Sequence, residues 1–169
     1  THTLYCMYYE DVFKALNNAG VDYLVVGGVA LVLHGVVRMT VDLDLVVDES
    51  EANLEKFVSA VEKLGYKPKV PVKLRDFVDE KKRRQWVVEK NMKVFSVYNP
   101  KAPYMIVDVL LDGQLDYPKL KRDRIVVDAG GIKVPVVSIK HLKELKLLSG
   151  RVQDVMDVKS LDELEDNEK

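Results

Sequence analysis

The strongest constraint on how this chain folds is a short aliphatic run that contains two aspartates. Residues 41–47 read VDLDLVV, and five of the seven are aliphatic, which predicts a buried strand. Side chains alternate across a strand, so Asp42 and Asp44 share one face while Leu43 and Leu45 share the other. Two carboxylates this close repel each other, and burying either one without a partner is costly. The pattern therefore requires a positive charge between the aspartates or an open edge beside them.

The rest of the chain mixes helical and strand patterns. This order predicts an α+β fold in which a mixed β-sheet is flanked by helices, within a single domain spanning 1–169. We expect a C-terminal helical pair at about 138–164 to pack on it. The other predicted helices cover 4–18, 29–34, 50–64 and 76–90, and the other strands 22–26, 92–98, 105–111 and a hairpin around 129–131.

A glycine pair between a strand and a helix is the second informative feature. Gly27 and Gly28 follow an apolar strand and precede an apolar helix that Gly35 is expected to end. Glycine lets the backbone approach a ligand closely, and a helix N-terminus offers unpaired amide donors and a positive dipole end. This combination suits a phosphate. Arg38 and Thr40 lie just before the acidic strand, and we include them among the candidate nucleotide-binding residues.

The acidic strand supplies the ligands that a divalent metal prefers. Mg²⁺ binds one or two carboxylates together with substrate phosphates and water, so metal brought in with a nucleotide would provide the missing positive charge. Asp108 also stands alone among aliphatic residues, in MIVDVLLD. We predict that strand 105–111 lies beside strand 41–47, with Asp108 on the face of Asp42 and Asp44. Such a cluster suits two-metal phosphoryl transfer, with Mn²⁺ as an alternative to Mg²⁺.

Together these motifs resemble the signature of the polymerase-β-like nucleotidyltransferase superfamily. That signature is a hydrophobic residue, Gly, Gly or Ser, a spacer, then Asp, a hydrophobic residue, and Asp or Glu. Here Gly27-Gly28 is followed by thirteen residues and then by Asp42-Leu43-Asp44. The Arg-x-Thr-x-Asp-x-Asp form is similar to a small prokaryotic branch related to AbiEii-type toxins. The C-terminal KLLSGRVQDVMDVKSL resembles the same branch, in which a Lys, an Arg and an Asp-x-x-Asp match Lys146, Arg151, Asp154 and Asp157.

The resemblance implies the nucleotidyltransferase fold and Mg²⁺-dependent transfer of a nucleoside monophosphate from an NTP to an acceptor, with release of pyrophosphate. It implies that the three strand aspartates are metal ligands and catalytic residues, and that the glycine pair is the turn beside the phosphates. It also makes Lys146 a nucleotide-binding residue. The acceptor stays undefined, with RNA, tRNA and protein as candidates, and an antitoxin is a candidate partner protein.

Each of these residues also has a structural interpretation. Asp42 and Asp44 can flank a strand end and pair with Arg38 or a distant lysine, and Asp108 can pair with an arginine. Arg38 is a phosphate clamp in one interpretation and the partner of these carboxylates in the other. The C-terminal motif fits ordinary helix ion pairs. Two alternative functions therefore accompany nucleotidyl transfer: a catalytically silent binding module, such as a toxin–antitoxin component, and a metal-dependent phosphohydrolase.

Two basic clusters, KKRRQW at 81–86 and KLKRDR at 119–124, bear on an RNA acceptor. The first contains Trp86, the only tryptophan, and arginine with tryptophan can hold single-stranded RNA by charge and stacking. Because Asp79, Glu80 and Glu89 are nearby, a solvated charged helix face is the simpler interpretation.

Composition limits the partners and the compartment. The formal net charge is −1, so no global field draws the chain onto nucleic acid or a membrane. The single cysteine, Cys6, rules out an internal disulfide. No apolar run approaches the roughly 20 residues that span a bilayer, and the first residues do not resemble a signal peptide. We therefore expect a cytoplasmic protein that does not bind membranes.

Overall fold

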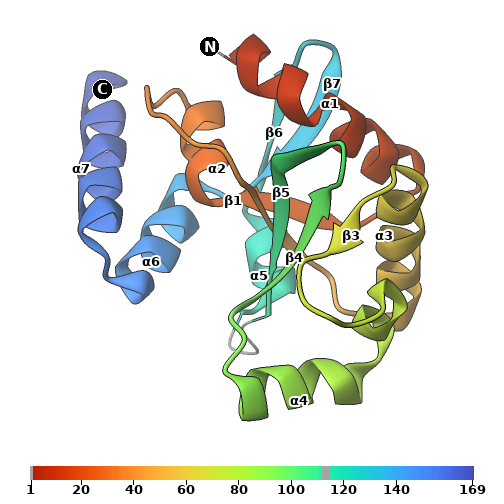
Figure 1. The fold of residues 1–169 in the computed structure, drawn as a ribbon. Coiled ribbons are helices and arrows are strands. Elements are labelled where there is room, and N and C mark those ends of the chain that lie inside the picture. Colours follow the sequence, from red (N-terminus) through yellow and green to blue (C-terminus); the bar gives the residue numbers. More distant parts are fainter. Residues whose placement is uncertain (1, 112–114) are drawn as a thin grey trace.

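A seven-stranded mixed sheet forms the centre of the structure (Figure 1). The structure is a computed structural model that describes residues 2–111 and 115–169, with side chains from residue 8 onward. The strand order is β3-β4-β5-β2-β1-β7-β6. Strand β2 runs parallel to β5, and β1 runs parallel to β7, whereas the other neighbours are antiparallel. The strands are β1 (Tyr23–Val26), β2 (Leu43–Val47), β3 (Lys67–Pro68), β4 (Val94–Asn99), β5 (Ala102–Leu110), β6 (Ile125–Ala129) and β7 (Ile132–Val136).

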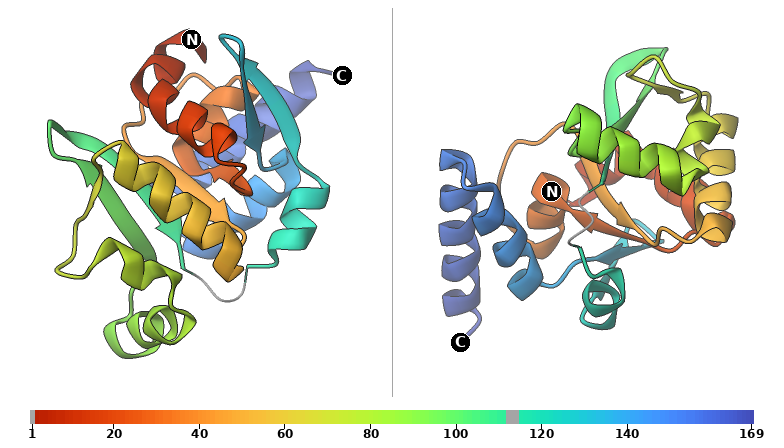
Figure 2. Two further views of the ribbon diagram at one scale, coloured as in Figure 1. Left: turned by 90° about the vertical axis from the view of Figure 1, so that its right-hand side faces the viewer. Right: turned by 90° about the horizontal axis from the view of Figure 1, so that it is seen from below.

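Helices lie on both sides of this sheet. Helices α1 and α3 cover one face, and the C-terminal helices α6 and α7 lie on the opposite side, with α7 outermost (Figures 1 and 2). This arrangement confirms the predicted α+β fold with its C-terminal helical pair. The helices are α1 (His2–Asn18), α2 (Gly27–His34), α3 (Glu51–Lys63), the short 3-10 helix η1 (Leu74–Val78), α4 (Glu80–Lys90), α5 (Tyr117–Arg122), α6 (Ile139–Ser149) and α7 (Val152–Asn167).

Capping residues explain where several helices begin and end. The Ser50 and Ser138 side chains accept from the third backbone amides of α3 and α6, as expected of serine at an N-cap. Gly35 ends α2 in the left-handed conformation. The predicted start of α4 at residue 76 is wrong, because 74–78 form η1. Helix α4 begins instead at Glu80, where the Asp79 carboxylate caps two amides.

The interpretation of Trp86 as an RNA-stacking residue is contradicted by its burial. The Trp86 ring is 4% exposed and stacks on Phe95 at 5.4 Å between centroids. Phe95 in turn stacks on Phe77 at 4.6 Å. Arg83, from the same basic cluster, is also buried and donates to the Phe77 carbonyl. This aromatic stack attaches α4 to the sheet, so its tryptophan is unavailable to nucleobases.

Among the residues that the structure describes, none of the helices combines the length and the apolar character needed to cross a membrane.

Asn53 connects α3 to the strands that carry the site. Its side chain is buried; it accepts from the Asp22 backbone amide at 2.7 Å and donates to the carbonyls of Asp22 at 3.0 Å and Asp48 at 2.7 Å. Asp22 precedes β1 and Asp48 follows β2. One amide side chain therefore joins the end of the β1–β2 pair that is remote from Asp44.

We predict that Asn53→Ala lowers the free energy of unfolding by roughly 2–3 kcal/mol, because it leaves buried backbone groups without partners. Urea unfolding measures the loss. Lys56→Ala, an exposed position on the same helix, should change stability by less than about 0.5 kcal/mol. Equal losses in the two variants would contradict the role of Asn53.

Candidate active site

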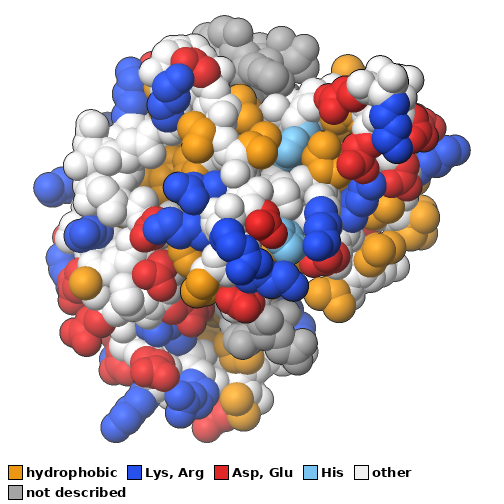
Figure 3. Space-filling view, turned by 180° about the vertical axis from the view of Figure 1, so that it is seen from behind, with side chains coloured by type: hydrophobic (Ala, Val, Ile, Leu, Met, Phe, Trp, Pro, Cys, Tyr) orange, Lys and Arg blue, Asp and Glu red, His pale blue; other side chains and the backbone are white. Residues whose placement is uncertain are grey.

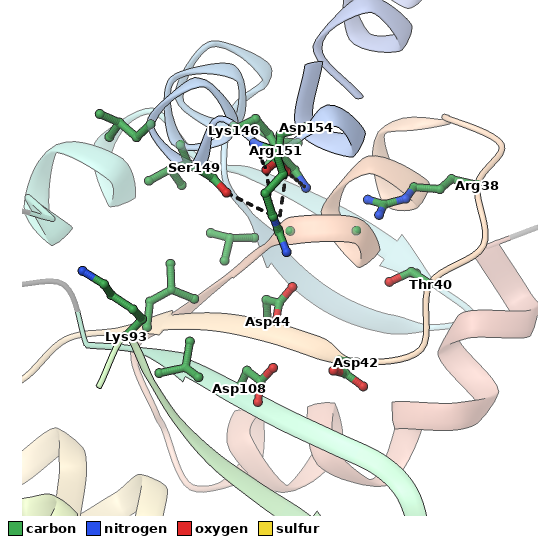
Figure 4. A pocket seen from close by; sticks show the side chains of 18 of the residues that line it. Arg38, Thr40, Asp42, Asp44, Lys93, Asp108, Lys146, Ser149, Arg151 and Asp154 are labelled. Carbon is green, nitrogen blue, oxygen red and sulfur yellow. Dashed lines mark hydrogen bonds and ion pairs between the residues drawn. The ribbon is translucent and has the colours of Figure 1, made fainter. Parts of the chain in front are cut away.

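An open cleft of about 1010 Å³ lies between the sheet and the C-terminal helices (Figure 4). One wall is the acidic edge of β2 and β5, and the other is the turn between α6 and α7, with the start of α2 at the base. All of the site residues predicted from sequence line this cleft, namely Gly27, Gly28, Arg38, Thr40, Asp42, Asp44, Asp108 and Lys146. Their roles in chemistry stay predictions, but the fold brings them together.

The three aspartates come from two adjacent parallel strands. Asp44 pairs directly with Asp108 in the β2–β5 register, which confirms the predicted neighbourhood of these strands. Asp42, Asp44 and Asp108 all point into the cleft (Figure 4). The predicted strand 41–47 is too long at its start, because β2 begins at Leu43 and Asp42 lies just before it. Asp42 therefore reaches the cluster from the loop, while the other two are held by the sheet.

Two hydroxyl groups that the sequence analysis missed support this edge. The Ser96 hydroxyl, opposite Asp108 in the β4–β5 register, donates to Oδ1 of Asp108 at 2.5 Å. The buried Tyr9 hydroxyl donates to the Val41 carbonyl and lies 3.2 Å from the Ile106 carbonyl. A serine within the otherwise apolar start of strand VFSVYN was the available signal for Ser96. The sequence gives no comparable signal for Tyr9, because tyrosines are common on amphipathic helices.

The environment of the carboxylates disfavours their ionisation. Burial, together with the neighbouring charges of Asp108 and Asp42, raises the pKa of Asp44 to about 7. Burial and the charge of Asp108 also raise the pKa of Asp42. Lys146 and Arg151 act in the opposite direction on the pKa of Asp44 without cancelling the effect. In the ligand-free protein these effects favour a protonated Asp44, and a cation bound beside the cluster would favour its ionised form.

The glycine pair lets two side chains approach the backbone. A Cβ on Gly27 would lie 2.1 Å from Oδ2 of Asp44, and Gly27 has a φ of 68°. A Cβ on Gly28 would lie 2.4 Å from Oγ1 of Thr40 and 3.0 Å from an Arg38 guanidinium nitrogen. Val26, at the N-cap of α2, provides no side-chain cap for the first turn of the helix. The turn thus places a helix N-terminus directly against the carboxylates.

A buried ionic network forms the opposite wall. Lys146 lies 3.3 Å from an Asp154 oxygen and 3.0 Å from an Asp157 oxygen. Arg38 pairs with Asp157 at 3.0 Å, and Arg151 pairs with Asp154 at 2.9 Å. Burial alone would raise the pKa of Asp154, but hydrogen bonds from Arg151, Ser149 and Lys146 outweigh it and hold that pKa far below the usual range.

This network clarifies two interpretations. Arg151 and Asp154 form an ion pair, which agrees with the interpretation of the C-terminal motif as helix ion pairs. Lys146 nevertheless also lines the cleft. Arg38 pairs with Asp157 on the last helix, a partner that lies 119 residues away in sequence and that the sequence analysis did not anticipate.

The donor set fits a hard divalent cation that shares its ligands with a bound polyanion. The three carboxylates offer only oxygen atoms as ligands, and their charges repel one another. Within the described part of the chain, no three Asp, Glu, His or Cys side chains are already arranged to hold a metal unaided. A metal at this edge would take further ligands from phosphate and water, as Mg²⁺ commonly does.

By sequence, the chain matches no family model and none of the curated proteins. By structure it is similar to a provisionally assigned nucleotidyltransferase from Thermotoga maritima (TM-score 0.59, 17% identity, covering 92% of this chain and 90% of that one). It is also similar to the lincosamide antibiotic adenylyltransferase LnuA bound to lincomycin (TM-score 0.61, 18% identity, 94% and 96% covered). A third match is ANT(2")-Ia in complex with adenylyl-2"-tobramycin (TM-score 0.59, 12% identity, 96% and 94% covered).

These likenesses extend over nearly the full length of each chain, so the protein has the nucleotidyltransferase fold. At such low identities they establish the fold alone.

We predict that Gly27→Ala destabilises the protein by about 3 kcal/mol or more, because the new Cβ combines left-handed strain with a clash against Asp44. Gly20→Ala is the matched control, since Gly20 has a φ of 71° but nothing within 4 Å of its added Cβ. It should lose only about 1 kcal/mol for the strain. Urea unfolding that finds the two variants equal would contradict the close approach of Asp44.

We also predict that the stability of the metal-free protein falls as pH rises from about 4 to about 7. The folded state keeps a proton on Asp44 up to a pKa of about 7, whereas the unfolded chain releases it near 3.8. The stabilisation by this proton is therefore fully present below the pKa of the unfolded chain. It is lost as the pH rises through the pKa of the folded state, by up to about 4 kcal/mol. Urea unfolding in EDTA at several pH values measures this.

Asp44→Asn should flatten the profile and be more stable than the wild type at pH 8. Asp11→Asn, an exposed position on α1, should leave the profile unchanged. An Asp44→Asn profile with the same slope as the wild type between pH 5 and 7 would refute the assignment of this pH dependence to Asp44.

Proposed function

We propose that this protein is a nucleotidyltransferase that moves a nucleoside monophosphate from an NTP to an acceptor hydroxyl and releases pyrophosphate. The observation that carries the proposal is the position of three carboxylates on one sheet face, directly beside a glycine turn that opens a helix. The nucleotidyltransferase fold of the chain agrees with it. Membership of the branch related to AbiEii-type toxins is the finer form of the same proposal.

The chain's own residues would hold the nucleotide by its phosphates. The first turn of α2 borders the cleft at Gly27 and Gly28, and the amides of a helix N-terminus suit phosphate oxygens. Arg38, Thr40 and Lys146 line the same cleft and would add positive charge and a hydroxyl. Asp108, held by Ser96, would orient an incoming hydroxyl at the end of the cleft opposite the glycines.

Asp42, Asp44 and Asp108 would hold Mg²⁺, or Mn²⁺ in its place. When bound, the metal supplies positive charge that neutralises the triphosphate and the leaving pyrophosphate and favours ionisation of the attacking hydroxyl. LnuA, a lincosamide antibiotic adenylyltransferase, has been solved with lincomycin bound, and ANT(2")-Ia with adenylyl-2"-tobramycin, which supports a small molecule as one candidate acceptor.

The acceptor is the least constrained part of the proposal. The lining of the cleft also includes aliphatic side chains, namely Leu115, Leu142, Leu145 and Leu148. On the face seen from behind, basic and acidic side chains are interspersed (Figure 3). This mixture does not favour an extended RNA track along that face. RNA, tRNA, protein and a small molecule thus stay candidate acceptors, to be separated by labelling a cell extract with radioactive NTP.

Two rival functions make different predictions from the same site. A silent binding module, such as a toxin–antitoxin component with a partner protein, would bind Mg·NTP without releasing any product. A phosphohydrolase would release inorganic phosphate instead of pyrophosphate. The intact set of three carboxylates favours turnover over the silent module.

We predict pyrophosphate release from at least one NTP when the protein is incubated with Mg²⁺ and cell extract as the source of acceptor. Asp44→Asn and Asp108→Asn should each reduce the rate by at least about 100-fold, because each removes a carboxylate that would hold the metal whose charge neutralises the transition state. Asp11→Asn should retain the wild-type rate. EDTA should abolish release, and added Mg²⁺ should restore it.

Phosphate as the product would assign a hydrolase, and binding of Mg·NTP without any product would assign the silent module. Wild-type rates in both strand variants would remove these aspartates from the chemistry.

A further inference from the structure

Arg151 differs from the other cations of the network in how far it reaches from the protein. Its side chain is 74% exposed, compared with 21% for Arg38 and 8% for Lys146. Lys146 is paired with two buried carboxylates, those of Asp154 and Asp157. Arg151 therefore carries the accessible positive charge on this wall of the cleft.

The Arg151 guanidinium is exposed but held in one orientation. Its Nε donates to Oδ2 of Asp154 at 2.9 Å and to Oγ of Ser149 at 3.1 Å, and Nη2 lies 3.4 Å from Oδ1 of Asp154. The backbone amide of Arg151 also donates to Asp154 at 3.2 Å. Asp154 is itself 1% exposed. Among the described residues none accepts from Nη1, so a planar group of fixed orientation presents a donor toward the cleft.

This donor faces the carboxylates from the opposite wall. Figure 4 shows Arg151 extending toward Asp44 from the side of the cleft where Lys146, Ser149 and Asp154 lie. Arg151 is close enough to Asp44 to act on its ionisation. A phosphate lying between the start of α2 and the strand aspartates would therefore have Arg151 on its remaining side.

The charges of the network point the same way. Asp154 and Asp157 pair with three cationic side chains, Arg38, Lys146 and Arg151. Arg151 is the most exposed of the three, so it is the cation that lies at the cleft surface. A guanidinium that is already oriented by a carboxylate loses little entropy when it binds phosphate, and its donors match phosphate oxygens.

We propose that Arg151 is the direct triphosphate-binding cation of this site, contributed by the last helix and held for that task by Asp154 and Ser149. This inference rests on the proposed function and extends it to a residue from outside the glycine and aspartate motifs. It makes the α6–α7 turn part of the nucleotide site and not only a support for it.

Calorimetric titration with inorganic tripolyphosphate and Mg²⁺ tests this without requiring turnover or an acceptor. Arg151→Gln should bind Mg·tripolyphosphate roughly 10- to 100-fold more weakly than the wild type, because charge-assisted hydrogen bonds are lost. Arg151→Lys should lie in between, since lysine keeps the charge without the planar fork. Arg84→Gln is the matched control: Arg84 is 70% exposed and pairs with Glu80 at 2.9 Å, but on α4, and this variant should bind as the wild type does.

Thermal unfolding of each variant accompanies the titration, so a loss of fold is not mistaken for a loss of affinity. Should Arg151→Gln unfold, the comparison of Arg151→Lys with the wild type carries the test. Wild-type affinity in the folded Arg151 variants would overturn the inference while leaving the proposed function intact. A wild-type protein that binds no Mg·tripolyphosphate would overturn both.

Discussion

The repulsion between Asp44 and Asp108, paired across two parallel strands, is the constraint around which this structure is organised. It persists because the other face of the same strands is packed. Leu43, Leu45, Val107 and Val109 are completely buried on that face, and each contributes about 1.5–3 kcal/mol relative to exposure. A slip of one residue would place the carboxylates in the core and the aliphatic residues in the cleft. Burial of the apolar face thus offsets the repulsion and fixes the register.

The same cluster explains why the glycine turn must be glycine. Asp44 approaches Gly27 so closely that any side chain would displace it, and the left-handed φ of Gly27 turns β1 directly into α2. The helix therefore starts beside the carboxylates instead of several residues away. A helix N-terminus attracts anions, and carboxylates attract cations. This short turn therefore places an anion-binding helix start next to the cation-binding carboxylates.

Local chemistry in the sequence was sufficient to predict most of this site. The alternation of MIVDVLLD placed Asp108 on the correct face, and Ser50, Ser138 and Gly35 marked helix ends, because these signals act within a few residues. Contacts between distant segments were not predictable in this way. The pairing of Arg38 with Asp157, the support from Tyr9 and the burial of Trp86 depend on how α7, α1 and α4 pack, which no short-range pattern encodes. The start of α4 was predicted wrongly because Asp76 and Asp79 are both plausible N-caps. Asp76 belongs to the 3-10 helix η1, and Asp79 is the residue that caps α4.

The two walls of the cleft carry opposite charge, and this restricts what can bind between them. A metal ion alone would satisfy the aspartates but would face the exposed guanidinium of Arg151 on the other wall. A polyanion alone would satisfy Arg151 and the α2 amides but would be repelled by three carboxylates. A metal bound together with a polyphosphate satisfies both walls at once. The metal neutralises the carboxylates, and the polyphosphate neutralises Arg151 and the α2 amides. The electrostatics of the cleft therefore favour a metal–polyphosphate complex over either component alone, and the helix that supplies Arg151 is as much part of that selection as the acidic strands.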